Sequence, residues 1–131
     1  MKEFDWPIRV YYEDTDAGGV VYHARYIAFF ERARTEMLRQ ANISQQSLLR
    51  DHVAFVVKNM SVDYIFPARL DDLLTVKTQV EQIRKASIVF TQQLVDQQNK
   101  IYCKASVTVA CVDVNKMKPC GFPPLFISEF L

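Results

Sequence analysis

The chain has 131 residues, of which 50% are hydrophobic and 24% are charged. This length and composition indicate one globular domain, residues 1–131, with a packed core rather than a disordered segment. Lys and Arg number 16 and Asp and Glu number 15, and the formal net charge of +1 excludes the large basic excess typical of nucleic-acid-binding proteins. A small anionic ligand held by a few local cations is compatible with this charge.

Residue types that build common cofactor and metal sites are scarce. The three glycines, Gly18, Gly19 and Gly121, lack the spacing of a dinucleotide-binding or phosphate-binding loop. Two histidines without an H-E-x-x-H pattern predict no metal site, and no other cofactor is expected.

The cysteines and the N-terminus indicate a cytoplasmic protein. The three cysteines have no C-x-x-C spacing, and we expect reduced thiols. A disulfide between Cys103 and Cys111 is disfavoured because both lie in one predicted strand. The N-terminus lacks a signal-peptide pattern, and no run approaches the roughly 18 apolar residues of a membrane span.

The first predicted elements are a strand, a loop and a long helix. Residues 6–12 (WPIRVYY) predict a strand that begins near Pro7, and the following EDTDAGG is rich in turn-forming residues. Residues 24–41 predict a helix, and Asn42 suits the position after its end. A weaker helical segment covers residues 43–52. The apolar residues of the long helix recur at helical spacing: Tyr26, Phe30, Ala33, Met37 and Ala41.

The rest of the chain predicts strands and an irregular tail. Residues 53–66 are rich in β-branched and aromatic side chains, and residues 74–81, 88–95 and 106–111 alternate between apolar and polar. Short connections at Arg84–Lys85 and at residues 96–100 suit hairpins, so the sheet is expected to be antiparallel. The tail from residue 116 to residue 131 contains three prolines and is expected to be irregular.

These elements predict an α+β fold of about five antiparallel strands and one long helix. A helix of 18 residues is about 27 Å long and covers one face of a curled sheet. Val89 and Val95 are expected on the other face, and the sheet edges are unpaired. We therefore expect the chain to form at least a homodimer.

The segment from Tyr11 to Tyr26, YYEDTDAGGVVYHARY, places Glu13, Asp14 and Asp16 just before two glycines and a helix start. Glycines allow a sharp turn, and a helix start offers free N–H groups with a partial positive charge. A carboxylate beside such donors suits acyl transfer, because the donors polarise a carbonyl while the carboxylate attacks it or activates a water. The same pattern also occurs as ordinary turn and capping chemistry.

Residues 9–26, RVYYEDTDAGGVVYHARY, resemble the signature of the 4-hydroxybenzoyl-CoA thioesterase family of hotdog-fold proteins. The segments FERARTEML, FPARLDD and MKP resemble the branch of acyl-CoA thioesterases associated with the Tol–Pal system, and the similarity covers nearly the whole chain. The resemblance implies the hotdog fold, a long central helix wrapped by an antiparallel sheet. It also implies hydrolysis of an acyl-CoA, with a leaning toward short aliphatic acyl groups, to a free acid and coenzyme A.

The resemblance assigns roles by position. The family's catalytic carboxylate falls on Asp16, as nucleophile or general base, and the backbone N–H that holds the thioester carbonyl falls on His23. Gly19, Val21 and Tyr22 are expected to line the substrate site. In hotdog dimers the site lies between subunits, so Asp16 is expected to face the partner's helix, and tetramers are common in the family.

Other charged residues have competing interpretations. Glu31, on the helix near its buried side, is the rival for the catalytic acid, and an ion pair with Arg32 or Arg34 is its alternative role. Asp14 is expected to be structural, accepting hydrogen bonds from loop amides. Many family members have Asn where this chain has Arg25, which we expect to face solvent.

Coenzyme A carries several phosphate charges, so cations are expected near its path. Arg84 and Lys85, in a predicted strand connection, are the first candidates. Lys116, Lys118 and Arg69 are alternatives, and each of the five also suits the role of an ordinary solvated charge.

Two other functions compete with hydrolysis. A non-catalytic scaffold would hold acyl-CoA or acyl carrier protein near phospholipid-synthesis enzymes, at the periphery of the inner membrane, but the intact Asp16 disfavours it. A hotdog dehydratase needs a histidine and an acid in a different arrangement, which the T-D-x-x-G loop does not fit.

Overall fold

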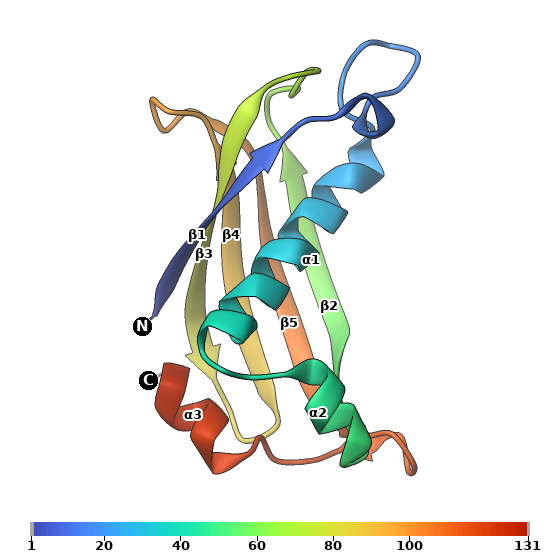
Figure 1. Cartoon of the computed structure of the whole chain (residues 1–131), viewed down its shortest axis with the longest axis vertical. Coiled ribbons are helices and arrows are strands. Elements are labelled where there is room, and N and C mark those ends of the chain that lie inside the picture. The colour runs from blue at the N-terminus through green and yellow to red at the C-terminus, as the bar shows by residue number, and fades with distance from the viewer. Residues whose placement is uncertain (1, 131) are drawn as a thin grey trace.

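The computed structural model describes residues 2–130, in which one long helix lies diagonally across one face of a curved antiparallel sheet (Figure 1). This is the predicted α+β architecture. The elements in chain order are β1 (Glu3–Arg9), the short 3-10 turn η1 (Tyr12–Asp14), α1 (His23–Gln40), α2 (Gln45–Arg50), β2 (Val53–Tyr64), β3 (Leu73–Ile83), β4 (Ser87–Val95), β5 (Ile101–Asp113), β6 (Lys118–Pro119) and α3 (Pro124–Phe130).

Helix α1 forms because its apolar side chains recur on one face, and that face is buried against the sheet. The predicted stripe is confirmed, since its five members are at most 7% exposed: Tyr26, Phe30, Ala33, Met37 and Ala41. The helix ends at Gln40, one residue earlier than predicted, and Asn42 follows the C-cap residue Ala41 in a left-handed conformation (φ 61°). The α1 stripe and the inward side chains of the sheet form one hydrophobic core.

The sheet has the strand order β1-β3-β4-β5-β2, with β6 added beside the end of β5. All strand pairs are antiparallel, and the two predicted hairpin connections join β3 to β4 and β4 to β5. Within the described residues, β1 and the 12-residue strand β2 are the two edges of the main sheet. Each edge therefore presents backbone groups that the described part of the chain leaves unpaired.

The first strand lies earlier than predicted. β1 spans Glu3–Arg9, so Pro7 sits in the strand's middle rather than at its start. The missing N–H is tolerated because β1 is an edge strand that pairs only with β3. Residues Tyr12–Asp14 turn instead of continuing the strand, because the Asp14 carboxylate and backbone bond back to Tyr11.

Val95 is 2% exposed although it does not belong to the core cluster, so its place on the outer face stays a prediction, but it is not an exposed apolar side chain there. A further expectation was wrong. The tail is not irregular throughout, since Pro124–Phe130 forms α3 and buries Phe126 and Phe130. Proline is well tolerated at a helix start, where its missing N–H has no intrahelical partner.

Candidate functional site

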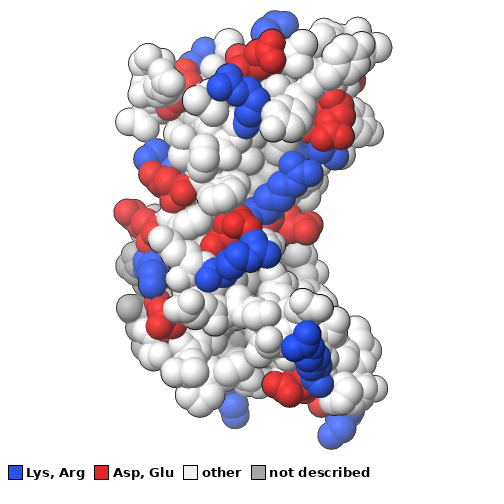
Figure 2. Space-filling model, viewed as in Figure 1, with Lys and Arg blue, Asp and Glu red and all other residues white. Residues whose placement is uncertain are grey.

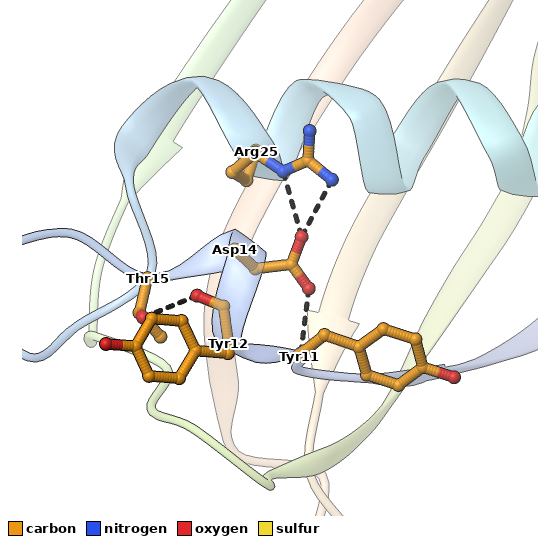
Figure 3. Close-up of polar contacts among 5 residues, drawn as sticks. All are labelled: Tyr11, Tyr12, Asp14, Thr15 and Arg25. Atoms are coloured by element: carbon orange, nitrogen blue, oxygen red, sulfur yellow. Dashed lines mark hydrogen bonds and ion pairs between the residues drawn. The ribbon is translucent and has the colours of Figure 1, made fainter.

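The loop before α1 is fixed by one buried carboxylate. Asp14 is 2% exposed, and its Oδ2 accepts a hydrogen bond of 2.8 Å from the backbone N–H of Tyr11. Its Oδ1 accepts from Arg25 Nε at 2.9 Å and lies 2.8 Å from the second guanidinium nitrogen (Figure 3). The structural role expected of Asp14 is therefore confirmed. The solvent-facing role expected of Arg25 is corrected, because its side chain is only 29% exposed and joins the first turn of α1 to the loop.

Asp16 lies in a tight turn that follows this anchored segment. Its backbone N–H donates to Val20 O at 2.9 Å, and its backbone C=O accepts from Gly19 N–H at 3.0 Å. Its side-chain Oδ1 accepts from Gly18 N–H at 2.8 Å. Gly19 has a φ of +79°, a left-handed conformation that glycine adopts without strain. The turn therefore fixes one carboxylate oxygen of an exposed Asp16 and leaves the other open to a ligand.

Helix α1 begins immediately after this turn. Tyr22 is its N-cap residue and makes no side-chain capping bond, and His23 is the first helical residue. The backbone N–H groups of His23 and Ala24 donate to no acceptor within residues 2–130. Free amides at a helix start carry a partial positive charge and form a ready site for a carbonyl oxygen or an anion. The first turn of α1 has no acidic side chain that competes for these amides.

Aromatic side chains surround the start of α1. The Tyr64 hydroxyl donates to the backbone carbonyl of His23 at 3.1 Å, and the Tyr64 ring lies edge-on to the His23 and Tyr26 rings. The buried Tyr26 hydroxyl accepts from Ala68 N–H at 3.0 Å, and burial raises the pKa of that phenol. Sequence reasoning had taken Tyr26 as core packing and had missed Tyr64, which comes from the end of β2 and is distant in the chain.

Of the other predicted substrate residues, Val21 and Tyr22 lie near the Asp16 turn, whereas Arg84 and Lys85 lie far from it. Val21 is 4% exposed and belongs to the core, and its backbone N–H donates to Ala68 O at 2.9 Å. Tyr22 is 46% exposed beside the His23 ring. Arg84 and Lys85 lie in the β3–β4 turn, at the opposite end of the sheet from the loop that carries Asp16 (Figure 1). The described single chain therefore does not bring these two cations to the Asp16 turn.

Large apolar side chains are exposed at the Asp16 end of the molecule. They come from the loop before α1, from the end of β2 and from the loop that leads into β3: Tyr11, Tyr12, Tyr22, Tyr64, Ile65, Phe66, Leu70 and Leu73. Exposed patches of this kind are typical of surfaces that contact a ligand or another protein chain. Charged groups do not dominate the face drawn in Figure 2, where Lys and Arg alternate with Asp and Glu.

Glu31, the rival acid, lies about two turns beyond the start of α1, is exposed and forms no ion pair within the described chain. It lines a cavity between α1 and the sheet, next to β2. Asp16 does not line this cavity. The alternative ion pair with Arg32 or Arg34 is therefore not formed in residues 2–130.

The sequence analysis did not predict a contact between two polar side chains, Arg34 on the wall of this cavity and its partner Gln92. Both are nearly fully buried, and Arg34 donates to the side-chain oxygen of Gln92 at 3.0 Å. The sequence pattern did indicate that both side chains are buried. Arg34 follows Phe30 by four residues on the buried stripe of α1, and Gln92 stands between the inward-facing Phe90 and Leu94.

The described residues contain no group of three or more His, Cys, Asp or Glu side chains that could hold a metal ion. In the same part of the chain, no helix is long and apolar enough to cross a membrane. Cys103 and Cys111 are both free thiols of β5, as expected.

Comparison with known proteins agrees with this fold. The family model of the thioesterase-like superfamily matches residues 10–130. The acyl-CoA thioester hydrolase YbgC of Escherichia coli O6:H1 is 57% identical over 127 residues, which cover 97% of this chain and 95% of that protein. The acyl-CoA thioesterase YbgC of Haemophilus influenzae is 58% identical over 121 residues, 92% and 88% of the two chains. The fold matches the crystal structure of Slr0204 from Synechocystis with a TM-score of 0.93 at 21% identity, over 98% and 96% of the chains.

Proposed function

The chain belongs to the thioesterase-like superfamily, among the YbgC acyl-CoA thioester hydrolases, and from this we propose that it hydrolyses acyl-CoA at a site built on Asp16 and the start of α1. The observation that supports this site most strongly is the placement of an exposed, oriented carboxylate on the turn that leads directly into a helix with free first amides.

The reaction adds water across the thioester, breaks the carbon–sulfur bond and releases a carboxylic acid and a thiol. The His23 N–H, with the partial positive charge of the helix start, stabilises the negative charge that develops on the carbonyl oxygen. Asp16 either attacks the carbonyl carbon or removes a proton from the attacking water. In both versions Gly18 N–H holds Oδ1, so that Oδ2 is the oxygen that acts.

A second copy of the chain completes this site in our proposal. The apolar side chains at the Asp16 end and the unpaired edge of β2 both lack a partner within the described residues. Arg84 and Lys85 lie too far from Asp16 in their own chain, so they reach the coenzyme A phosphates only if they come from another subunit. A dimer is the minimum assembly that meets these requirements, and a tetramer also meets them.

The acyl group of the substrate is a short aliphatic one in this proposal. The test is a panel of acyl-CoA thioesters of increasing chain length, with release of the free thiol followed by a colour reagent and binding followed by calorimetry. We expect thiol release to be fastest with short aliphatic chains. Binding without thiol release across the whole panel would contradict hydrolysis and would favour the scaffold that the sequence left open.

A further inference from the structure

A cavity of about 260 Å3 lies beside the C-terminal half of α1, away from the Asp16 turn. From His23 to Arg34 the helix rises about 16 Å, so this cavity is separate from the helix start. Seven of the eleven lining side chains are apolar, and they come from α1, β2, β4, β5 and α3: Leu38, Phe55, Val57, Ile88, Phe90, Val109 and Phe126. The polar side chains on the wall are Glu31, Arg34, Thr35 and Gln45.

Arg34 is a buried cation without an anionic partner in the described chain. Its side chain lines the cavity and the residue is 7% exposed. One of its nitrogens donates to Gln92 Oε1 at 3.0 Å, and no carboxylate lies within 4.0 Å of it in residues 2–130. A guanidinium group has five N–H donors, so most of them are free of protein acceptors.

Neutral contacts hold Arg34 in place. The amide nitrogen of Gln92 donates to the backbone carbonyl of Phe30 at 2.9 Å and to Thr78 Oγ1 at 3.0 Å. These bonds fix the oxygen of Gln92 toward Arg34 but supply no negative charge. Burial lowers the pKa of the guanidinium, and the charge of Glu31, which forms no ion pair with it, opposes this shift only in part.

A buried charge without a partner is unfavourable, and a bound anion removes that cost. A guanidinium binds a carboxylate through two parallel hydrogen bonds. The apolar wall around Arg34 suits the hydrocarbon part of an organic acid better than an inorganic ion. Glu31 is the acidic side chain on the wall, and it lies at the exposed side of the cavity, where its charge opposes a second carboxylate.

We propose that Arg34 binds the carboxylate of a small organic acid whose apolar tail fills this cavity. At about 30 Å3 for each water-sized group, the volume accommodates roughly eight non-hydrogen atoms, the size of hexanoate. Hydrolysis of a short acyl thioester releases an acid of this class, and identifying the ligand as the product rests on the proposed function. Binding of the acid itself does not depend on that function.

The test is calorimetric titration of the full-length protein, in its native assembly, with hexanoate and with hexanamide. The two probes have the same number of non-hydrogen atoms, but only hexanoate is charged. We expect hexanoate to bind at least tenfold more tightly than hexanamide. Arg34→Met should remove this difference, and Glu31→Gln should tighten hexanoate binding several-fold because it removes a competing charge.

Asp16→Asn should leave hexanoate binding unchanged, which separates this site from the proposed catalytic turn even in an inactive protein. Circular dichroism shows whether Arg34→Met folds. If it does not fold, the difference in affinity between hexanoate and hexanamide, measured on the wild type and on Glu31→Gln, tests the proposal instead. Equal binding of hexanoate and hexanamide, no binding of hexanoate, or full binding by folded Arg34→Met would overturn the proposal.

Discussion

Arg25, in the first turn of α1, forms an ion pair with the buried carboxylate of Asp14, eleven residues earlier in the chain. The same carboxylate accepts a hydrogen bond from Tyr11 N–H, and the Asp14 backbone carbonyl accepts one from Tyr22 N–H. Asp14 therefore connects the start of the loop to the first turn of α1 (Figure 3), and its backbone carbonyl adds the N-cap residue Tyr22. This connection fixes both ends of the segment that carries Asp16.

Removing either partner of this pair should destabilise the protein. Arg25→Met leaves a buried carboxylate without its cation, and we expect the free energy of unfolding to fall by about 1.5–3 kcal/mol. Because Arg25 is partly exposed, this decrease in the free energy of unfolding is smaller than the decrease expected for a fully buried ion pair. Urea denaturation measures the change. In a double-mutant cycle with Asp14→Asn, additive losses would show that the two side chains do not interact.

The two glycines of the Asp16 turn should respond differently to alanine. A Cβ at Gly18 would lie 3.2 Å from Asp16 Oδ1, the oxygen that the Gly18 N–H holds. Gly18→Ala should therefore displace the carboxylate and lower kcat by about tenfold to a hundredfold, with little change in unfolding free energy. Gly19→Ala meets no neighbouring atom within 4 Å but strains a left-handed backbone, so it should cost about 1–2 kcal/mol of stability.

Thiol-release kinetics and urea denaturation on both glycine variants check this contrast. Unchanged kcat in Gly18→Ala would show that the position of the Asp16 carboxylate does not matter for turnover. An unchanged stability in Gly19→Ala would show that the turn relaxes to another conformation.

Cys111 and Cys120 should form a disulfide on mild oxidation, whereas Cys103 should not take part. The sulfur atoms of Cys111 and Cys120 lie 3.5 Å apart, where a short movement reaches the bonding distance of about 2.05 Å. Diamide, which accepts the two electrons and two protons, should remove two hydrogen masses from the protein. Burial raises the pKa of both the Cys103 and the Cys111 thiols to about 12, so the difference between them comes from geometry: Cys111 lies beside the partly exposed Cys120, whereas Cys103 is fully buried.

Mass spectrometry of peptides identifies the linked residues. Cys120→Ser is the matched control and should abolish the oxidation, because Cys111 then has no neighbouring thiol. A disulfide that includes Cys103, or oxidation that persists in Cys120→Ser, would contradict the geometry of the β5–β6 region.

Local periodicity predicted the elements that depend on local contacts. The helical spacing of Tyr26, Phe30 and Met37 predicted α1 to within one residue at each end. A helix that buries one face needs apolar residues at this spacing. The alternation of apolar and polar side chains in the later segments predicted three antiparallel strands and the hairpins between them, because a strand that buries one face needs this alternation. The family signature added the expected position of the carboxylate and the helix start.

Features that depend on distant contacts were not accessible from the sequence. The register shift between Leu94 and Val95 is a property of the β4–β5 pair. The helix α3 was not predicted because the tail contains three prolines, and its Phe126 and Phe130 are buried against the rest of the chain. The distance between Arg84 and Asp16 follows from the sheet topology, and the ion pair of Arg25 follows from the fold of the loop.

In our proposal the Asp16 carboxylate, held beside the free amides at the start of α1, breaks the thioester. Asp16→Asn keeps the size of the side chain and an oxygen for the Gly18 N–H, but it removes the charge that attacks the carbonyl or activates water. Glu31→Gln is the matched control for the other candidate acid on α1, and its activity should persist.

The decisive measurement is the steady-state rate of thiol release from the best short acyl-CoA, compared among wild type, Asp16→Asn and Glu31→Gln. We expect Asp16→Asn to lower kcat by at least about a hundredfold while KM and the unfolding transition change little. We expect Glu31→Gln to keep most of the wild-type kcat. An Asp16→Asn protein that retains more than about a tenth of the wild-type kcat would contradict the claim.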